Sequence, residues 1–308
     1  MKSGTQNSIE QKPLTSFVKK IFYFSIWILA LIGLSSLGTR VFQNSRASGE
    51  KIGLVEIVGM ITDSRDVVNQ ISLYRRDNSI LGIILRIDSP GGAVAPSQEI
   101  YEEVLKTRKE KKIISSLGSM AASGGYYIAS SSEHIIANPG TLTGSIGVIF
   151  ASSNIEELIN KIGLKPVVIK SGKFKDSGSP VRTMTKEEKN LLQGVVDDVH
   201  SQFVQAIVNG RNLPESEVRK IADGSVFTGK RALDLKLVDQ LGGLEDSIEW
   251  MKRTLHLKNR PKIVQKKEKA SLFQFLLENF SQEWFTATSL YRRPTLQFLW
   301  PSSLNEWR

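Results

Sequence analysis

The sequence has no cysteine in its 308 residues. Disulfide bonds, thiolate nucleophiles and cysteine-ligated zinc or iron–sulfur sites are therefore excluded. Histidine is almost as scarce, with three residues at His134, His200 and His256. None of the three lies in a glycine-rich loop of the kind that delivers catalytic groups, so each is interpreted as structural. Chemistry that depends on cysteine is ruled out, and chemistry that depends on histidine is disfavoured.

The signature of a nucleic-acid-binding protein is also missing. The net charge is +10, but residues 1–50 carry +4 and residues 252–308 carry +7, so the part between them is nearly neutral. That middle part contains no basic stripe interleaved with aromatic residues. Basic ends beside apolar segments are typical of proteins that contact anionic lipid, so membrane lipid is the expected partner and nucleic acid is not.

One long run without charge stands near the N-terminus. Ile21–Leu37 contains seventeen uncharged residues, the short end of the range for a membrane-spanning helix, and two lysines precede it. Because the positive charges come first, residues 1–20 are expected in the cytoplasm and the chain after Arg40 outside it. A cleaved signal peptide is the alternative, but no clean A-x-A cleavage site follows, so we favour a retained anchor at 21–42 and a linker at 43–50.

Beyond the linker, apolar runs of strand length alternate with longer amphipathic segments. Strands are expected at 52–58, 80–87, 112–117, 134–137 and 166–170, and helices at 63–76, 93–109, 155–162, 185–209, 213–222, 229–235 and 244–255. This alternation predicts an α/β fold with largely parallel strand pairing. We expect the folded domain to cover residues 51–258.

The tail at residues 259–308 differs in composition. It has a basic run, then Leu272–Leu277, and it ends in aromatic residues that include Phe298 and Trp300. We expect a helical tail, but a lone surface helix would not carry so many large apolar groups. Our hypothesis is that residues 265–308 bury these groups against a neighbouring subunit or the membrane surface. Packing on the parent core is the alternative.

A glycine- and alanine-rich stretch, Gly118–Tyr127, follows one of the expected buried strands. Ser123 stands where that strand meets a short helix, with little steric cover. The backbone N–H of Gly124 lies near the helix start, where a developing oxyanion would be stabilised. This follows the logic of a nucleophile elbow, although the G-x-S-x-G spelling is absent. The alternative is a helix N-terminus capped by Ser123, with small residues for close packing.

A serine nucleophile needs a base. With the histidines interpreted as structural, lysine is the remaining option, as known Ser-Lys pairs show. A lysine can act as a base only where its surroundings leave the amine neutral. The polar loop at 171–184 contains Lys173 and Lys175. Taken alone, Lys175 is better interpreted as a solvated loop lysine.

A series of motifs makes the chain resemble the S49 family of serine peptidases, in particular bacterial signal peptide peptidase A of the short, single-domain form. The motifs occur in the family's order and cover about residues 50–255. They are Asp88–Gly92, Gly118–Ile128, Thr143–Val148, Ser171–Asp176, Val181–Thr185, Ala222–Gly229 and Val238–Gly243.

The resemblance implies roles for individual residues. Ser123 matches the nucleophile, and Lys175, the lysine directly before an aspartate, matches the general base in preference to Lys173. Ser145 matches the hydroxyl that orients the lysine. The backbone N–H groups of Gly92 and Gly124 match the oxyanion hole. The family needs neither metal nor cofactor, so none is expected here.

The fold implied is the Clp protease/crotonase type of repeated ββα units, with the N-terminal transmembrane helix and the C-terminal helical tail added. Clp proteases place a histidine in the segment that corresponds to Thr143–Val148, and this chain has none there, which disfavours a Ser-His-Asp triad.

The expected function is that of a membrane-anchored serine endopeptidase, a homo-oligomer at the bacterial cytoplasmic membrane with its catalytic domain on the extracytoplasmic side. By resemblance, it degrades cleaved signal peptides and other unfolded hydrophobic peptides. A catalytically inert membrane scaffold of the same fold is the main alternative. A crotonase-like acyl-CoA enzyme is a third, because that fold also pairs backbone N–H groups as an oxyanion hole.

Overall fold

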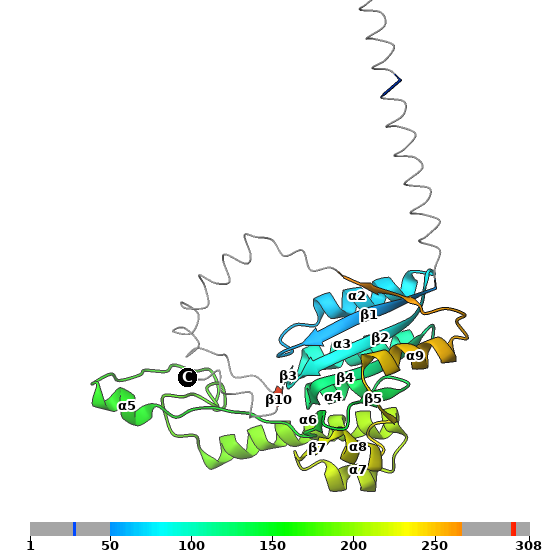
Figure 1. Ribbon diagram of the computed structural model, residues 1–308. Helices are drawn as coiled ribbons and strands as arrows, with labels where there is room; N and C mark the ends of the chain where they lie inside the picture. The colour runs from blue at the N-terminus through cyan, green and yellow to red at the C-terminus, as the bar shows by residue number, and fades with distance from the viewer. Residues whose placement is uncertain (1–26, 29–49, 267–296, 300–308) are drawn as a thin grey trace, which may run out of the picture. The chain divides into compact units, whose positions relative to one another are not determined.

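The computed structural model describes residues 27–28, 50–266 and the backbone of 297–299 (Figure 1). The expected anchor at 21–42 and the linker at 43–50 fall outside these residues, except for the helical pair Trp27 and Ile28 and for Glu50. Within the described residues, no helix combines the length and apolar character needed to cross a membrane. The chain divides into two compact units, residues 1–49 and 50–308, and all the strands belong to the second.

A largely parallel sheet organises this second unit. Its strands are β1 (Lys51–Val58), β2 (Ile80–Ser89), β4 (Lys112–Ala122), β5 (Ile135–Ala137), β6 (Leu142–Gly144), β7 (Val226–Thr228), β8 (Gln240–Leu241) and β9 (Lys262–Gln265). The order along the sheet is β7-β6-β4-β2-β1-β9, and β5 pairs with β4 and β8. Only the pair β6–β7 is antiparallel within this sheet. Two short strands, β3 (Gly91–Ala93) and β10 (Gln297–Leu299), form a second small sheet.

Helices cover both faces of the main sheet. They are α2 (Arg65–Arg76), α3 (Val94–Arg108), α4 (Gly124–Ala129), α5 (Glu156–Lys161), α6 (Lys186–Arg211), α7 (Glu215–Ile221), α8 (Gly229–Asp234) and α9 (Leu244–Thr254). Successive β2 residues point to opposite layers: Ile83 and Leu85 join the larger cluster with α2, α3, α4 and α6, whereas Ile84 joins the smaller one with α9. All three side chains are fully buried, which explains the continuous apolar run in the sequence. The predicted α/β class with largely parallel pairing is confirmed.

The prediction of a strand at residues 166–170 is wrong. The segment forms no strand, and Val167 and Ile169 are 85% and 97% exposed. The segment has the β-branched composition of a strand, but composition stabilises a strand only where a neighbouring strand and a packed face are present. Neither is present around this segment in the described chain.

The sheet also extends past the expected end of the domain at residue 258. Strand β9 pairs in parallel with β1, with Ile263 opposite Ile52. Within the expected helical tail, the described backbone of 297–299 is a strand, β10, that pairs with β3. The rest of the tail, residues 267–296 and 300–308, lies outside the described residues.

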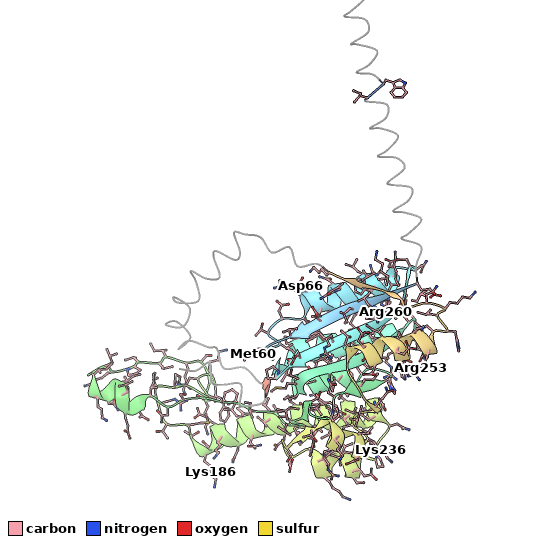
Figure 2. All side chains as sticks on the ribbon, viewed as in Figure 1. Met60, Asp66, Lys186, Lys236, Arg253 and Arg260 are labelled. Atoms are coloured by element: carbon pink, nitrogen blue, oxygen red, sulfur yellow. The ribbon has the colours of Figure 1, made fainter. Side chains whose placement is uncertain are left out.

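An arm, residues 151–184, separates β6 from α6 and projects from the sheet (Figure 1). None of its residues from 151 to 175 is buried, and Figure 2 shows its side chains standing away from the layers of the domain. The exposed large apolar side chains of the arm are Ile155, Leu158, Ile162, Leu164, Val167, Val168, Ile169 and Phe174. A folded domain rarely leaves so many such groups in water unless another surface covers them.

Helix α6 joins the arm to the domain and lies close to α4. This close packing leads to a prediction about stability. A Cβ at Gly210, near the end of α6, would collide with the backbone carbonyl of Ser130 at the end of α4. We expect Gly210→Ala to lower the free energy of unfolding by about 1–3 kcal/mol, because backbone atoms cannot rotate out of the way. Urea denaturation of the purified chain measures this change.

The matched control lies on the same helix. A Cβ at Gly194 would meet no atom within 4 Å, so Gly194→Ala should raise the free energy of unfolding by about 0.5–1 kcal/mol through helix propensity alone. Equal stabilities for the two variants would contradict the close packing of α6 on α4.

Candidate active site

Ser123 occupies a strained backbone conformation at the junction of β4 and α4. Its φ is 51° and its ψ is −115°, a region that residues with a side chain rarely adopt. Two hydrogen bonds hold it there: the Ser123 N–H donates to the carbonyl of Gly144 at 2.8 Å, and the Tyr127 N–H donates to the carbonyl of Ser123 at 2.8 Å. Such strain of about 1–3 kcal/mol persists where surrounding structure enforces it, and it clusters at active sites.

The Ser123 hydroxyl makes no hydrogen bond that would stabilise the fold within the described residues. The residue is 1% exposed, and its Oγ is buried without a hydrogen-bond partner among the described residues. It does not cap α4, so the alternative interpretation of Ser123 as an N-cap is not supported. Because buried hydroxyls are nearly always paired, an unpaired one at a strained junction makes Ser123 a candidate reacting group.

The backbones of Gly92 and Gly124 meet beside Ser123. A Cβ at Gly124 would lie 3.3 Å from the nitrogen of Gly92 and 2.7 Å from Ser97 Oγ, and a Cβ at Gly92 would collide with the backbone of Ile61. Glycine at position 92 is therefore required by the backbone of Ile61, and glycine at position 124 allows its close approach to Gly92. The structure brings together the two residues expected to form the oxyanion hole.

The hydrogen bonds of β3 show which way Gly92 faces. On one edge of β3, the Ile61 N–H donates to the Gly91 carbonyl at 2.8 Å, and the Ala93 N–H donates to the Ile61 carbonyl at 2.7 Å. Backbone polar groups of successive strand residues point to opposite edges, so the N–H and C=O of Gly92 face the other edge. An N–H that faces away from Ile61 is free of that bridge and can serve a substrate.

Ser145 leaves the strand next to Ser123. Ala122 of β4 pairs with Gly144 of β6, and the parallel strands end together, so the next residue of each, Ser123 and Ser145, emerges at the same edge of the sheet. Ser145 also has a positive φ, 50°, and its N–H donates to the carbonyl of Ser225 at 2.8 Å. It is buried, at 5% exposure.

A bulge in β4 sets the position of this edge. Between two flanking pairs, β4 has two more residues than β2, since Ile87 pairs with Leu117 and Ser89 with Ala121. The Asp88 carboxylate accepts the backbone N–H groups of the bulge, from Ser119 at 3.3 Å and Met120 at 3.1 Å. The sequence alone did not reveal this role of Asp88, although a carboxylate at the end of a buried strand was a signal for it.

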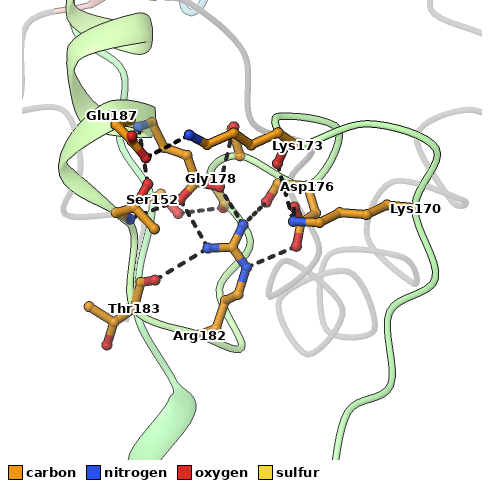
Figure 3. A network of polar contacts seen from close by, with 11 residues as sticks. Ser152, Lys170, Lys173, Asp176, Gly178, Arg182, Thr183 and Glu187 are labelled. Atoms are coloured by element: carbon orange, nitrogen blue, oxygen red, sulfur yellow. Dashed lines mark hydrogen bonds and ion pairs between the residues drawn. The ribbon is translucent and has the colours of Figure 1, made fainter.

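Lys175 lies on the exposed arm. Its loop is anchored by Arg182, which donates from Nε to Asp176 at 2.8 Å and pairs with Glu188 in the capping box of α6, while Lys170 pairs with Asp176 at 2.5 Å (Figure 3). Hydrogen bonds from Arg182 lower the pKa of the Glu188 carboxyl to about 2 and, together with Lys170, lower that of Asp176 further. The loop is thus tied to the first turn of α6.

The chain by itself does not join Lys175 to Ser123. Lys175 is exposed, and Ser123 Oγ has no hydrogen-bond partner among the described residues. Lys173, the other loop lysine, pairs with Glu187 at 3.0 Å and stacks on the Phe174 ring at 5.4 Å. The structure therefore assembles the residues expected as nucleophile, oxyanion donors and lysine-orienting hydroxyl, but the expected base is not among them.

The sequence of the chain is similar to those of known proteases. The model of peptidase family S49 matches residues 106–258, which contain Ser123, Ser145 and Lys175, and the Clp protease model matches residues 50–141. A candidate protease of Synechocystis sp. is 44% identical over 202 residues, 65% of this chain and 73% of that protein.

Two further relatives match more of this chain. A candidate signal peptide peptidase SppA of Enterococcus faecium is 34% identical over 281 residues, 87% of this chain and 79% of the relative. A candidate protease of Methanocaldococcus jannaschii is 31% identical over 271 residues, 80% and 86% respectively.

The bulge generates a prediction about the reactivity of Ser123. Asp88→Ala removes both acceptors, so the end of β4 should shift and the labelling rate of Ser123 by a serine-directed phosphonate should fall roughly hundredfold, the typical cost of misplacing a reacting group by about 1 Å. Asp88→Asn keeps a carbonyl acceptor and should retain part of the rate. Labelling is followed by intact-protein mass spectrometry.

A control for general destabilisation lies at the other end of β2, the strand that contains Asp88. Asp77 accepts the N–H of Ser79 at 2.8 Å just before β2 begins, so Asp77→Ala removes a comparable bond far from the bulge. It should leave the labelling rate unchanged. If Asp77→Ala and Asp88→Ala label equally fast, Asp88 does not position the serine.

Proposed function

The chain belongs to peptidase family S49, and from this we propose that it is a serine endopeptidase with Ser123 as nucleophile and Lys175 as general base. The observation that carries the proposal is the buried, unpaired hydroxyl of Ser123 at a strained junction against the backbones of Gly92 and Gly124. The family resemblance supplies the choice of Lys175, and the engagement of Lys173 with Glu187 supports it.

The mechanism follows from these positions. The neutral amine of Lys175 takes the proton of Ser123 Oγ as the oxygen attacks the peptide carbonyl carbon. The N–H groups of Gly92 and Gly124 stabilise the oxyanion. The lysine ammonium then protonates the leaving amine as the C–N bond breaks. The neutral amine then deprotonates a water that attacks the acyl-enzyme carbonyl. As the ester bond to Ser123 Oγ breaks, the lysine ammonium returns the proton to that oxygen, while Ser145 orients the amine.

We further propose that Lys175 reaches Ser123 from a second copy of the chain in a homo-oligomer. Within one chain the arm projects from the domain and leaves Ser123 unpaired (Figure 1). The arm also exposes apolar side chains that include Leu164, Val167 and Ile169, and covering them on a neighbouring subunit would be favourable. One docking event would then bury the arm and complete the site.

The expected substrates are extended peptides, in particular signal peptide remnants and other unfolded hydrophobic segments. The edge of β3 that Gly92 faces can take such a peptide by strand addition, in place of β10, and main-chain hydrogen bonds of this kind bind many sequences. The Enterococcus relative's name points to the same substrate class. A Clp protease/crotonase-like fold is consistent with the parallel sheet and with the Clp match at residues 50–141.

We also propose that residues 21–42 anchor the protein in the cytoplasmic membrane, with the domain on the extracytoplasmic side. The two lysines before Ile21 support this orientation, because positive charge stays on the cytoplasmic side. Signal peptide remnants are left in the membrane, so an anchored peptidase would meet them there.

Substitution of the two proposed catalytic residues tests the function. Ser123→Ala and Lys175→Ala should each lower peptide hydrolysis by roughly a thousandfold or more, and the double variant should be little worse, because the residues act as a unit. Lys173→Ala is the matched control on the same loop and should keep activity. Retained activity in Lys175→Ala with loss in Lys173→Ala would reassign the base. Retained activity in both would end the dyad proposal.

Co-expression of the two inactive variants tests the source of the lysine. A mixed oligomer of Ser123→Ala and Lys175→Ala subunits should regain about a quarter of the wild-type rate, because some interfaces pair an intact serine with an intact neighbouring lysine. No recovery in a verified mixed oligomer would show that each chain supplies its own base. Both experiments measure the rate at which a fluorogenic apolar peptide is hydrolysed.

Topology is tested by a reporter. Alkaline phosphatase fused after Arg308 should be active, because it folds only outside the cytoplasm, and deletion of residues 21–42 should abolish its activity. An inactive fusion with the apolar segment intact, at equal protein level, would overturn the proposed orientation.

A further inference from the structure

The main sheet has a second functional candidate at the edge where its parallel strands begin. Strands β1, β2, β4, β5 and β9 are parallel neighbours, so their first residues share one edge of the sheet, opposite the edge at which Ser123 emerges. Helices α2, α3 and α9 end at this edge too, because each is followed after a short loop by one of these strands. For α9 the packing agrees, since a Cβ at Gly82, near the start of β2, would touch Met251 and Leu255.

Six cations of this edge form no ion pair with any carboxylate of the described residues. They are Lys51, Arg76, Lys109, Arg253, Lys258 and Lys262, and together we call them the basic edge. Neighbouring carboxylates are already engaged: Glu110 pairs with Arg75 at 2.7 Å, and Glu133 pairs with Lys112 at 2.5 Å. All six cations except Lys51 are exposed, and Figure 2 shows Arg253 at this end of the domain. Positive charge is therefore presented to solvent here without compensation.

Two of these cations are held together by the strand register. Lys51 of β1 lies opposite Lys262 of β9, and like charges at opposite positions of neighbouring strands repel each other. The backbone fixes this register, because the Lys262 N–H donates to the carbonyl of Glu50 at 2.8 Å. An anion bound at this edge would offset the repulsion between the two ammonium groups.

The loop that leads into β9 continues the same charge pattern. From Lys252 to Lys262 the chain contains five Lys or Arg residues and no Asp or Glu. An uncompensated run of this kind favours a partner that presents many negative charges on one surface. A second copy of the chain does not fit, because it would bring the same cations to the contact.

We propose that the basic edge docks on anionic phospholipid headgroups of the membrane that holds the chain. This rests on the anchor proposed at residues 21–42, and it adds a second, electrostatic contact made by the folded domain itself. Only residues 43–49 separate that anchor from Glu50, and seven residues span at most about 25 Å in any conformation. The edge at which β1 begins is thus kept close to the bilayer, and docking there leaves the edge that holds Ser123 uncovered.

A single cysteine can report the contact, because the chain has none of its own. Asn259→Cys, an exposed position beside Lys258, is labelled with a fluorophore, and the full-length chain is reconstituted into vesicles that carry nitroxide-headgroup lipid. The label should be strongly quenched when about a third of the lipid is phosphatidylglycerol, and weakly quenched in phosphatidylcholine alone. Gly140→Cys is the matched control: it is exposed, follows β5 at the opposite edge of the sheet, and should stay unquenched in both.

Charge reversal identifies the surface that makes the contact. Each Lys or Arg near an anionic surface favours docking roughly fivefold, so the triple variant Arg253→Glu, Lys258→Glu and Lys262→Glu should lower the ratio of docked to undocked domain roughly hundredfold. These substitutions break no ion pair of the described residues, and Lys262→Glu places an opposite charge across from Lys51, so the fold should be kept. Thermal unfolding checks this.

Two further measurements complete the test. The triple variant Lys189→Glu, Lys220→Glu and Lys230→Glu changes the net charge by the same amount on α6, α7 and α8, at exposed lysines, and should leave the quenching unchanged. In the chain without charge variants, 1 M NaCl should abolish the quenching, because the Debye length falls to about 3 Å.

The outcomes separate this inference from the proposed function. Equal quenching at position 259 with and without phosphatidylglycerol would overturn it, and so would an equal loss in the two triple variants or equal quenching at position 140. None of these results bears on the peptidase, because no hydrolysis is measured. If the full-length chain does not float with neutral vesicles, the anchor proposal is wrong. Salt-sensitive quenching at position 259 with anionic vesicles would then still support docking by the basic edge.

Discussion

The positive φ of Ser123 is the constraint on which the candidate site depends. A serine in this conformation is strained, and it stays there because β4 and β6 end in register and because α4 begins at the next residue. Helix α4 is wholly buried, and the Tyr126 hydroxyl inside it donates to the carbonyl of Leu237 at 2.8 Å. Any relaxation of Ser123 would have to move that helix through the core. The strain is therefore sustained by packing rather than by contacts of the serine side chain.

The same helix connects the serine to the arm. Tyr127 of α4 packs edge-on against Phe203 of α6, with ring centroids 5.1 Å apart. The first turn of α6 holds Glu188, which pairs with Arg182, which in turn binds Asp176 beside Lys175. The ion pairs hold the pKa values of both carboxyl groups below the ordinary range, that of Glu188 at about 2, so the stability they contribute is complete above about pH 4.5 and is lost as the pH falls through the lowered pKa values. The arm loop keeps its anchor at neutral pH, although it packs on little else.

Some of this could be predicted from the sequence, and the division has physical reasons. Buried strands and amphipathic helices carry their periodicity in the chain, so β2, β4 and α6 are foreseeable, as is the capping box at Thr185. The exposed stretch around Val167 reads as a strand because sequence shows composition and not whether a partner is present. The bulge held by Asp88 and the pairing of β10 with β3 depend on contacts between residues far apart in the chain, which a single sequence does not encode in any local pattern.

The pairing of β10 with β3 and the exposure of the arm, neither of which the sequence alone reveals, have a common origin. To bind peptides as proposed, β3 must expose a row of backbone donors and acceptors, and Gly92 must lack a side chain so that the backbone of Ile61 can approach it. An exposed edge of this kind will pair with any available strand. In the described chain, β10 fills it. The arm is exposed for a similar reason. Its apolar side chains must stay uncovered within one chain if the arm is to dock on another. If the site is assembled from the edge of β3 and from the arm of a second copy, as proposed, it is incomplete in the isolated chain, and docking of the arm would cover apolar side chains and complete the site in one step.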